Sequence, residues 1–266
     1  MKDLIERIPK KYKYLIHTVM IVVPLWFVSD TNQAVEWGIV IMIFATTVVG
    51  TIFTQDVRDK RDYIFVLLLP LHLSIGILLS MHFFPNLSIF IRAATLLMVG
   101  GLFYAVSLVN NILLVVDVRE NLIPLYRAAI TWSQILLVIV AIPFLAGVFK
   151  LPFNPLIQTA FVALSSFLFA LYMFWVLGFD RDLKRLSLSK QLVCSMLASF
   201  YVASFSISVA FIPTESFLRA IFVASVLMSA LGYFQNYLKN SVTARIILEY
   251  AAIVGAFFVL LIVFRP

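Results

Sequence analysis

Nine apolar segments follow one another along this chain, with only short polar gaps between them. Each has about 16 to 29 residues, which is enough or nearly enough to cross the hydrocarbon core of a bilayer as a helix. Backbone groups in hydrocarbon must pair within their own helix, so the fold class expected is all-α, a polytopic transmembrane helix bundle forming one domain over residues 1–266. The predicted spans are 13–29, 35–54, 63–83, 88–116, 122–148, 156–178, 190–212, 216–238 and 244–264.

Positive charge is concentrated in alternate gaps between these segments. Loops on the cytoplasmic side retain Lys and Arg, so this asymmetry predicts a cytoplasmic N-terminus and a C-terminus outside. Only Arg92, Lys150, Arg219 and Arg265 fall in or beside the other gaps. The remaining sixteen of the 20 basic residues are Lys2, Arg7, Lys10, Lys11, Lys13, Arg58, Lys60, Arg61, Arg119, Arg127, Arg181, Lys184, Arg185, Lys190, Lys239 and Arg245.

The composition excludes a soluble protein and identifies the lipid bilayer as the main partner. Hydrophobic residues make up 63% of the chain and charged residues 12%, about half the usual share in soluble proteins. The net charge of +7 is explained by basic loops that attract anionic lipids, and no nucleic-acid partner is expected. We expect a multi-pass protein of the cell membrane, in a bacterium the inner membrane.

Small and amide side chains within the spans predict contacts between helices. Small residues recur at steps of three or four in two spans, and small side chains let membrane helices approach closely. They are Ser195, Ser199, Ala203, Ser206 and Ala210 in the seventh span, and Ser225, Ser229 and Gly232 in the eighth. The amides of Gln134, Gln158, Gln235 and Asn236 are expected to bond across helices.

Four polar residues mark a possible intramembrane site. Asn110 and Asn111 lie deep in the fourth segment, and Arg245 and Glu249 stand four residues apart at the start of the ninth. Polar groups within spans are often functional, although an Arg–Glu pair at this spacing also forms a local ion pair on one helix face.

Two acidic loops are the other candidate site. Asp56 and Asp59 lie between the second and third segments, and Asp180 and Asp182 lie between the sixth and seventh. Facing carboxylates could hold Mg²⁺ ions, which in turn bind a diphosphate. The arrangement resembles the intramembrane aromatic prenyltransferases, which also have nine helices and aspartate-rich motifs in these two loops. The resemblance implies Mg²⁺ as cofactor and those four aspartates as its ligands; otherwise no cofactor is expected.

The stretch that begins at Asn110-Asn111-Ile112 and ends at Ala129 is similar to uncharacterised multi-pass membrane proteins of uncultivated bacteria, and that similarity implies no activity. Short loops, few ionisable groups within spans and small-residue stripes favour a non-enzymatic membrane component or complex subunit. A Mg²⁺-dependent prenyltransferase-like enzyme acting at the cytoplasmic face is the alternative. A small-solute transporter is the second alternative, because Pro24, Pro70 and Pro143 lie within spans, where transporters often have broken helices.

Overall fold

A computed structural model describes residues 9–28, 37–55, 57, 59–83, 88–118, 125–180, 183 and 186–264 of the chain. These residues are folded almost entirely into helices, and no strand occurs among them. The nine helices of the described ranges are α2 (Lys10–Val28), α3 (Trp37–Thr54), α4 (Asp62–Phe83), α5 (Ile89–Val118), α6 (Leu125–Lys150), α7 (Pro155–Leu177), α8 (Leu188–Ala210), α9 (Ser216–Leu238) and α10 (Ala244–Val263).

The predicted all-helical bundle is confirmed. Eight of the helices in the described part of the chain, α3 to α10, are long and apolar enough to cross a membrane. The chain is therefore a multi-pass membrane protein. Helix α2 has lysines in its first turn and is not among the eight, so its role as a ninth span stays a prediction.

Local sequence explains where several helices begin. The side chains of Asn154, Ser187 and Thr243 each accept a hydrogen bond from a backbone N–H in the first turn of α7, α8 and α10. These caps satisfy N–H groups that have no partner inside the helix. Pro155 starts α7, where its missing N–H costs nothing. Asn240 has a φ of 51° in the turn between α9 and α10, a left-handed conformation that Asn tolerates.

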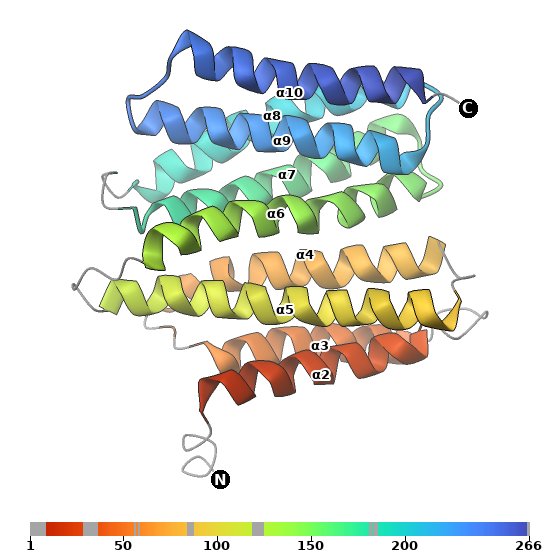
Figure 1. Cartoon of the computed structure of the whole chain (residues 1–266), viewed down its shortest axis with the longest axis vertical. Coiled ribbons are helices and arrows are strands. Elements are labelled where there is room, and N and C mark those ends of the chain that lie inside the picture. Colours follow the sequence, from red (N-terminus) through yellow and green to blue (C-terminus); the bar gives the residue numbers. More distant parts are fainter. Residues whose placement is uncertain are drawn as a thin grey trace.

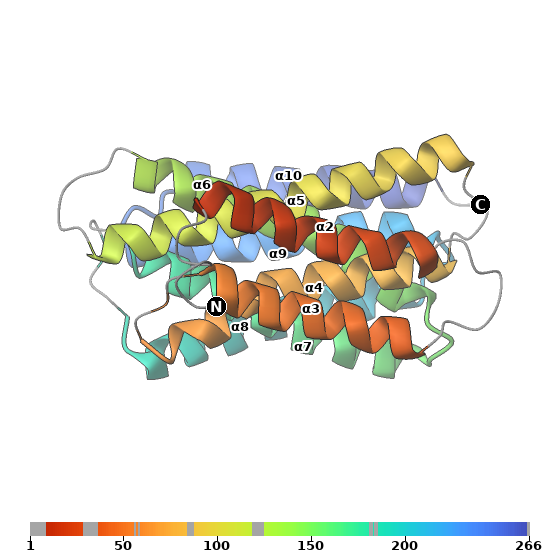
Figure 2. The same ribbon diagram turned by 90° about the horizontal axis from the view of Figure 1, so that it is seen from below.

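The helices form two layers, which Figures 1 and 2 show from two sides. The front layer contains α2, α5, α6, α9 and α10, each packed against the next in that order. The rear layer contains α3, α4, α7 and α8, again in that order. Rear helices pack on front helices at α2–α3, α4–α5, α4–α6, α6–α7 and α8–α9. The front layer is thus one helix longer than the rear one.

The same arrangement can be divided into two four-helix units with equivalent connectivity. In each unit, α2–α5 and α6–α9, consecutive helices pack together and the fourth packs on the first. Helix α10 is added to the second unit alone. The two acidic loops are equivalent, because each joins the second and third helices of its unit.

Glycines allow a close approach between the two units where α4 packs on α6. A Cβ on Gly76 would lie 2.9 Å from the backbone N of Phe144, and one on Gly147 would lie 2.4 Å from Leu79 Cβ. A side chain at either position would force α4 and α6 apart, as expected for membrane helices that meet at small residues.

The predicted small-residue seam of α8 is confirmed. Ser195, Ser199 and Ser206 are buried, and α8 packs along α7. Ser199 Oγ donates to the carbonyl oxygen of Ala163 at 2.6 Å across this contact. Ser225 and Ser229 of α9 are also buried, and Gly232 leaves room for the Tyr250 ring of α10.

Successive helices run in opposite directions, so charge is sorted in space as well as in sequence. We call the end where α2, α4, α6, α8 and α10 begin the basic end. Within the described residues, Arg92, Lys150 and Arg219 lie toward the opposite end of the bundle. The basic end carries Lys10, Lys11, Lys13, Lys60, Arg61, Arg127, Lys190, Lys239 and Arg245. Its assignment to the cytoplasm remains a prediction from the distribution of Lys and Arg.

Candidate functional site

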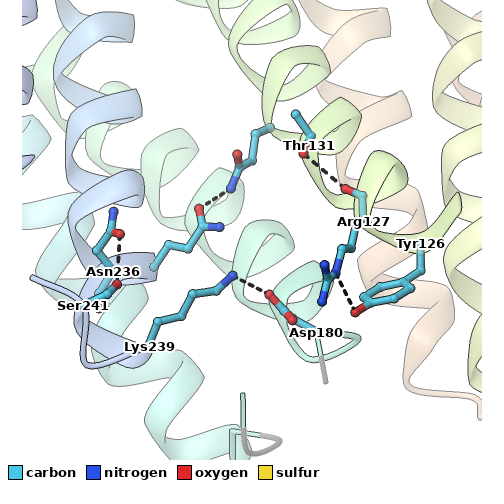
Figure 3. A network of polar contacts seen from close by, with 9 residues as sticks. Tyr126, Arg127, Thr131, Asp180, Asn236, Lys239 and Ser241 are labelled. Carbon is cyan, nitrogen blue, oxygen red and sulfur yellow. Dashed lines mark hydrogen bonds and ion pairs between the residues drawn. The ribbon is translucent and has the colours of Figure 1, made fainter. Parts of the chain in front are cut away.

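The basic end of the second unit holds a network of polar contacts between helices, drawn in Figure 3. Its central interaction is an ion pair between Asp180, which follows α7, and Lys239, which follows α9. The Lys239 Nζ and Asp180 Oδ2 atoms are 2.7 Å apart, and the Asp180 side chain is only 6% exposed. Burial of a carboxylate is costly unless it is paired. The ammonium group of Lys239 supplies that partner and ties the end of α9 to the loop after α7.

Helix α6 contributes a second set of contacts to this network. Arg127 Nε donates to the Tyr126 hydroxyl oxygen at 3.1 Å, and the guanidinium lies 5.9 Å from the centre of that ring. Thr131 Oγ1 donates to the Arg127 carbonyl oxygen at 3.1 Å. Figure 3 shows this group beside the Asp180–Lys239 pair. The arginine therefore lies where α6 enters the bundle, held against an aromatic face that favours a cation.

Amide side chains extend the network toward the middle of the bundle. The Gln134 amide nitrogen of α6 donates to Gln235 Oε1 of α9. Asn236 Nδ2 donates to the Tyr250 hydroxyl oxygen of α10 at 3.3 Å and to the Gly232 carbonyl oxygen at 2.8 Å. The contacts of Gln134, Gln235 and Asn236 across helices confirm the prediction made for these amides. Gln158 Nε2 of α7 donates at 3.4 Å to the Phe149 carbonyl oxygen in the last turn of α6, and at 2.8 Å to the Leu151 carbonyl oxygen in the connection between these helices.

A second group of polar contacts lies at the seam between the two units. Trp175 Nε1, in the last turn of α7, donates a hydrogen bond to Asp62 Oδ1, at the start of α4; the two atoms are 2.9 Å apart. The Trp175 ring also stacks on Phe65, with centroids 5.8 Å apart. Asp62, which follows the first acidic loop, and Trp175, which lies just before the second, are therefore in direct contact.

Asn110 connects three helices at this seam. Its side chain is fully buried; Oδ1 accepts from the Tyr172 hydroxyl of α7 at 2.9 Å, and Nδ2 donates to the Val66 carbonyl of α4 at 3.3 Å. Asn111 faces a different neighbour, because its Oδ1 accepts from Lys10 Nζ of α2 at 3.0 Å. The two asparagines thus fasten α5 to α4, α7 and α2.

The other two residues of the predicted intramembrane site lie elsewhere. Arg245 Nε and Glu249 Oε1 of α10 are 2.9 Å apart, with side chains 88% and 57% exposed. Helix α10 packs mainly on α9, at the opposite edge of the front layer from α2. The structure therefore does not bring Asn110 and Asn111 together with Arg245 and Glu249.

The predicted metal ligands are only half described. Asp56 and Asp182 lie outside the described residues. Asp59 is exposed and accepts from the backbone N–H of Arg61 at 3.0 Å, whereas Asp180 is the buried partner of Lys239. Within the described ranges, no group of three or more His, Cys, Asp or Glu side chains is placed to hold a metal ion. The described donors do not by themselves form a Mg²⁺ site.

The residues that sequence reasoning missed are Asp62, Trp175, Tyr172 and Lys239 as contact partners. Lys239 was counted only among the basic loop residues, and no contact was predicted for Asp62, Tyr172 or Trp175. A Trp or Tyr with a polar atom in the last turns of a span was a usable signal, because a buried N–H or O–H needs an acceptor. Comparison of the chain with protein-family models, curated proteins and solved structures finds no match.

Proposed function

We propose that this chain is a non-enzymatic membrane component, a helical subunit that takes its place in a larger membrane complex. The observation that carries the proposal is that three pairs of its buried or half-buried polar side chains are bonded to one another across the bundle. Asp180 is paired with Lys239, Asn110 with Tyr172, and Gln134 with Gln235. Each pair joins two different helices, so each holds the bundle together.

The chemistry of these pairs supports a structural role. A catalytic carboxylate must reach a proton, a metal ion or a substrate. The Asp180 side chain is buried, and its carboxylate Oδ2 forms an ion pair with the Lys239 ammonium group. Removing one member of such a pair leaves the other without its partner and destabilises the fold. The prolines within α2, α4 and α6 leave these helices continuous, unlike the broken helices that many transporters use.

The basic end suits the cytoplasmic face of the membrane. Each Lys or Arg near an anionic leaflet contributes roughly 1 kcal/mol of attraction. We expect a cysteine introduced at Lys60, in a Cys194→Ala background, to react with a membrane-impermeant maleimide in inside-out vesicles and not in intact cells. Labelling in intact cells would reverse the assigned orientation.

The experiment that tests the proposed role is sizing of the assembly in native membranes. The full chain, tagged and expressed at its natural level, is extracted in a mild detergent and separated on native gels. We expect an assembly that contains a second membrane protein at a fixed ratio to this chain in several detergents. Recovery of this chain alone, together with an enzymatic or transport activity of the purified protein, would overturn the proposal.

A Mg²⁺-dependent prenyltransferase-like activity is the second candidate, favoured by the Asp62–Trp175 contact that adjoins both acidic loops. Facing carboxylates could then hold Mg²⁺ and a diphosphate from both sides. The test measures diphosphate release from a prenyl diphosphate and an aromatic acceptor by the reconstituted protein, with and without Mg²⁺. Turnover that disappears in Asp56→Asn and Asp182→Asn variants of unchanged thermal stability would support this candidate. Absence of turnover in the native chain would remove it.

A further inference from the structure

His17 of α2 is enclosed within the first unit without a hydrogen bond. The residue is 3% exposed, and neither nitrogen of its ring has a hydrogen-bond partner among the described residues. Backbone groups of Thr46 and Thr47 in α3 lie near the ring, but the carbonyl groups of an α-helix already accept bonds from their own helix. A buried ionisable side chain in a membrane bundle is costly, and it therefore often has a function.

Close fit holds the His17 ring against α3. A Cβ on Gly50 would overlap the Cδ2 and Nε2 atoms of His17, so glycine is what leaves room for the imidazole. The next residue, Thr18, also buries a hydroxyl group without a partner, and a Cβ on Gly100 of α5 would lie 3.2 Å from its Cγ2 atom. At this level, α2 docks on α3 and α5 by shape rather than by polar bonds.

The described side chains of α2, α3 and α5 include no carboxylate to balance a charge on His17. Helix α3 contains no titratable residue, and those of α5 are Arg92, Tyr104 and Asp117. Tyr104 contacts the Tyr14 ring, with centroids 6.2 Å apart, whereas Asp117 stands thirteen residues farther on, about 20 Å along the helix. Between His17 and the basic end, α2 carries Lys10, Lys11, Tyr12, Lys13 and Tyr14. A protonated ring would therefore be both desolvated and repelled.

The opposite end of α2 is fastened to the bundle by Arg92 of α5. Arg92 donates to the Trp26 carbonyl oxygen at 2.6 Å, and its guanidinium lies 4.4 Å from the centre of the Trp26 ring. Pro24, two residues earlier, cannot donate the backbone hydrogen bond that would join the two halves of α2. The segment before Pro24 can therefore tilt while the segment after it stays fixed.

We propose that His17 is a proton-binding site that controls the docking of α2. With a neutral ring, the segment of α2 before Pro24 stays docked against α3 and α5. A proton from the basic end binds to an imidazole nitrogen, and no other covalent bond changes. The closed contact cannot accommodate the new charge, so the segment tilts away and its ring reaches water. Helix α2 stands at the edge of the front layer, where it has room to move (Figure 1).

The size of the effect follows from the ordinary protonation of imidazole. A His17 ring that reaches water titrates at about pH 6.5, whereas the docked ring stays neutral. Docking is therefore favoured above this pH and weakens as the pH falls below it. The ratio of undocked to docked α2 should rise about 30-fold between pH 7.5 and pH 5. Undocking uncovers the surfaces of α3 and α5 beneath α2, so pH changes the surface that the chain offers to a partner.

Distances between spin labels in lipid nanodiscs, measured by double electron–electron resonance, test this proposal. In a Cys194→Ala background, one pair of labels replaces Ile16 and Met196, and a control pair replaces Phe27 and Met196. All three native side chains are exposed, and Ile16 lies before Pro24 whereas Phe27 lies after it. Between pH 7.5 and pH 5, we expect the Ile16 pair to gain a second distance, with the 30-fold rise in its relative population. The Phe27 pair should not change.

Two substitutions separate protonation of His17 from a general effect of acid. His17→Gln stays neutral and should keep the Ile16 pair at the docked distance at both pH values. His17→Arg is charged at both, so the second distance should appear already at pH 7.5. Circular dichroism checks that both variants keep the helix content of the native chain. The proposal is contradicted by an unchanged Ile16 pair in the native chain, by an equal shift in His17→Gln, or by an equal shift of the Phe27 pair.

Discussion

The crossing of α4 and α6 at the centre of the bundle differs sharply from the edge formed by α10. A Cβ at Gly76 would meet the backbone of Phe144, whereas one at Gly255 would meet nothing within 4 Å. Eleven residues of α4 are buried, but Leu261 is the only buried residue of α10. Yet α10 is the most apolar of the candidate spans. In lipid, apolarity does not drive a helix into the core, because lipid tails are as apolar as its side chains.

The largest expected effect breaks the central contact. Gly76→Ala places a methyl group 2.9 Å from the Phe144 backbone N, which cannot move without shifting α6. We expect a loss of about 2–3 kcal/mol in unfolding free energy, in the upper part of the range for overpacked cores. Unfolding in mixed micelles, followed by tryptophan fluorescence, measures the loss.

Two further glycines sharpen the contrast between centre and edge. Gly147→Ala should cost about as much as Gly76→Ala, because its methyl group would lie 2.4 Å from Leu79 Cβ, an atom that the backbone of α4 holds in place. Gly255→Ala should leave stability unchanged in the monomer. Equal losses at all three positions would show that the central crossing is no tighter than the edge.

The next effect concerns the ion pair at the basic end. Asp180→Asn leaves Lys239 without its carboxylate, and we expect a loss of about 1–2 kcal/mol. This is less than the 3–5 kcal/mol seen for fully buried pairs, because Lys239 is 29% exposed and reaches solvent. Differential scanning fluorimetry in nanodiscs at low and high salt measures it. If Asp180→Asn were more stable than the native chain, burying the ion pair would cost more free energy than the pairing returns, and the pair would not serve to stabilise the fold.

A smaller effect is expected where Asn110 joins the two units. Asn110→Leu removes the acceptor of the Tyr172 hydroxyl, and Tyr172→Phe removes the donor. The coupling energy of a double-mutant cycle should be about 0.6 kcal/mol, the average for hydrogen bonds between membrane helices, and at most about 1.7 kcal/mol. Zero coupling would show that the bond contributes nothing to joining α5 and α7.

The smallest effect is expected at the edge. Arg245→Gln breaks an exposed ion pair within one helix and should change monomer stability by less than about 0.5 kcal/mol. Chemical unfolding under conditions that keep the protein monomeric checks this. A loss comparable to that of Asp180→Asn would mean that α10 is covered in the monomer.

Much of the architecture could be predicted because membrane helices are encoded locally. The span predicted at 63–83 became α4, Asp62–Phe83, and that at 216–238 became α9, Ser216–Leu238. Ser199 and Gln134 could be assigned to helix contacts because a polar group in a span needs a partner. Which partner each would find could not be predicted, since Ala163 and Gln235 come from helices whose neighbours depend on the folding of the whole bundle.

The sequence alone determined that this chain forms antiparallel membrane helices and that its basic residues gather at one end. Hydrocarbon forces each span to pair its own backbone, and short loops force successive spans to reverse direction. Only the tertiary structure decided that Asn110 is central and Glu249 peripheral, that Asp62 contacts Trp175, and that the two layers are unequal. These features depend on which helices pack together, and among uniformly apolar helices that choice rests on a few glycines, serines and polar pairs.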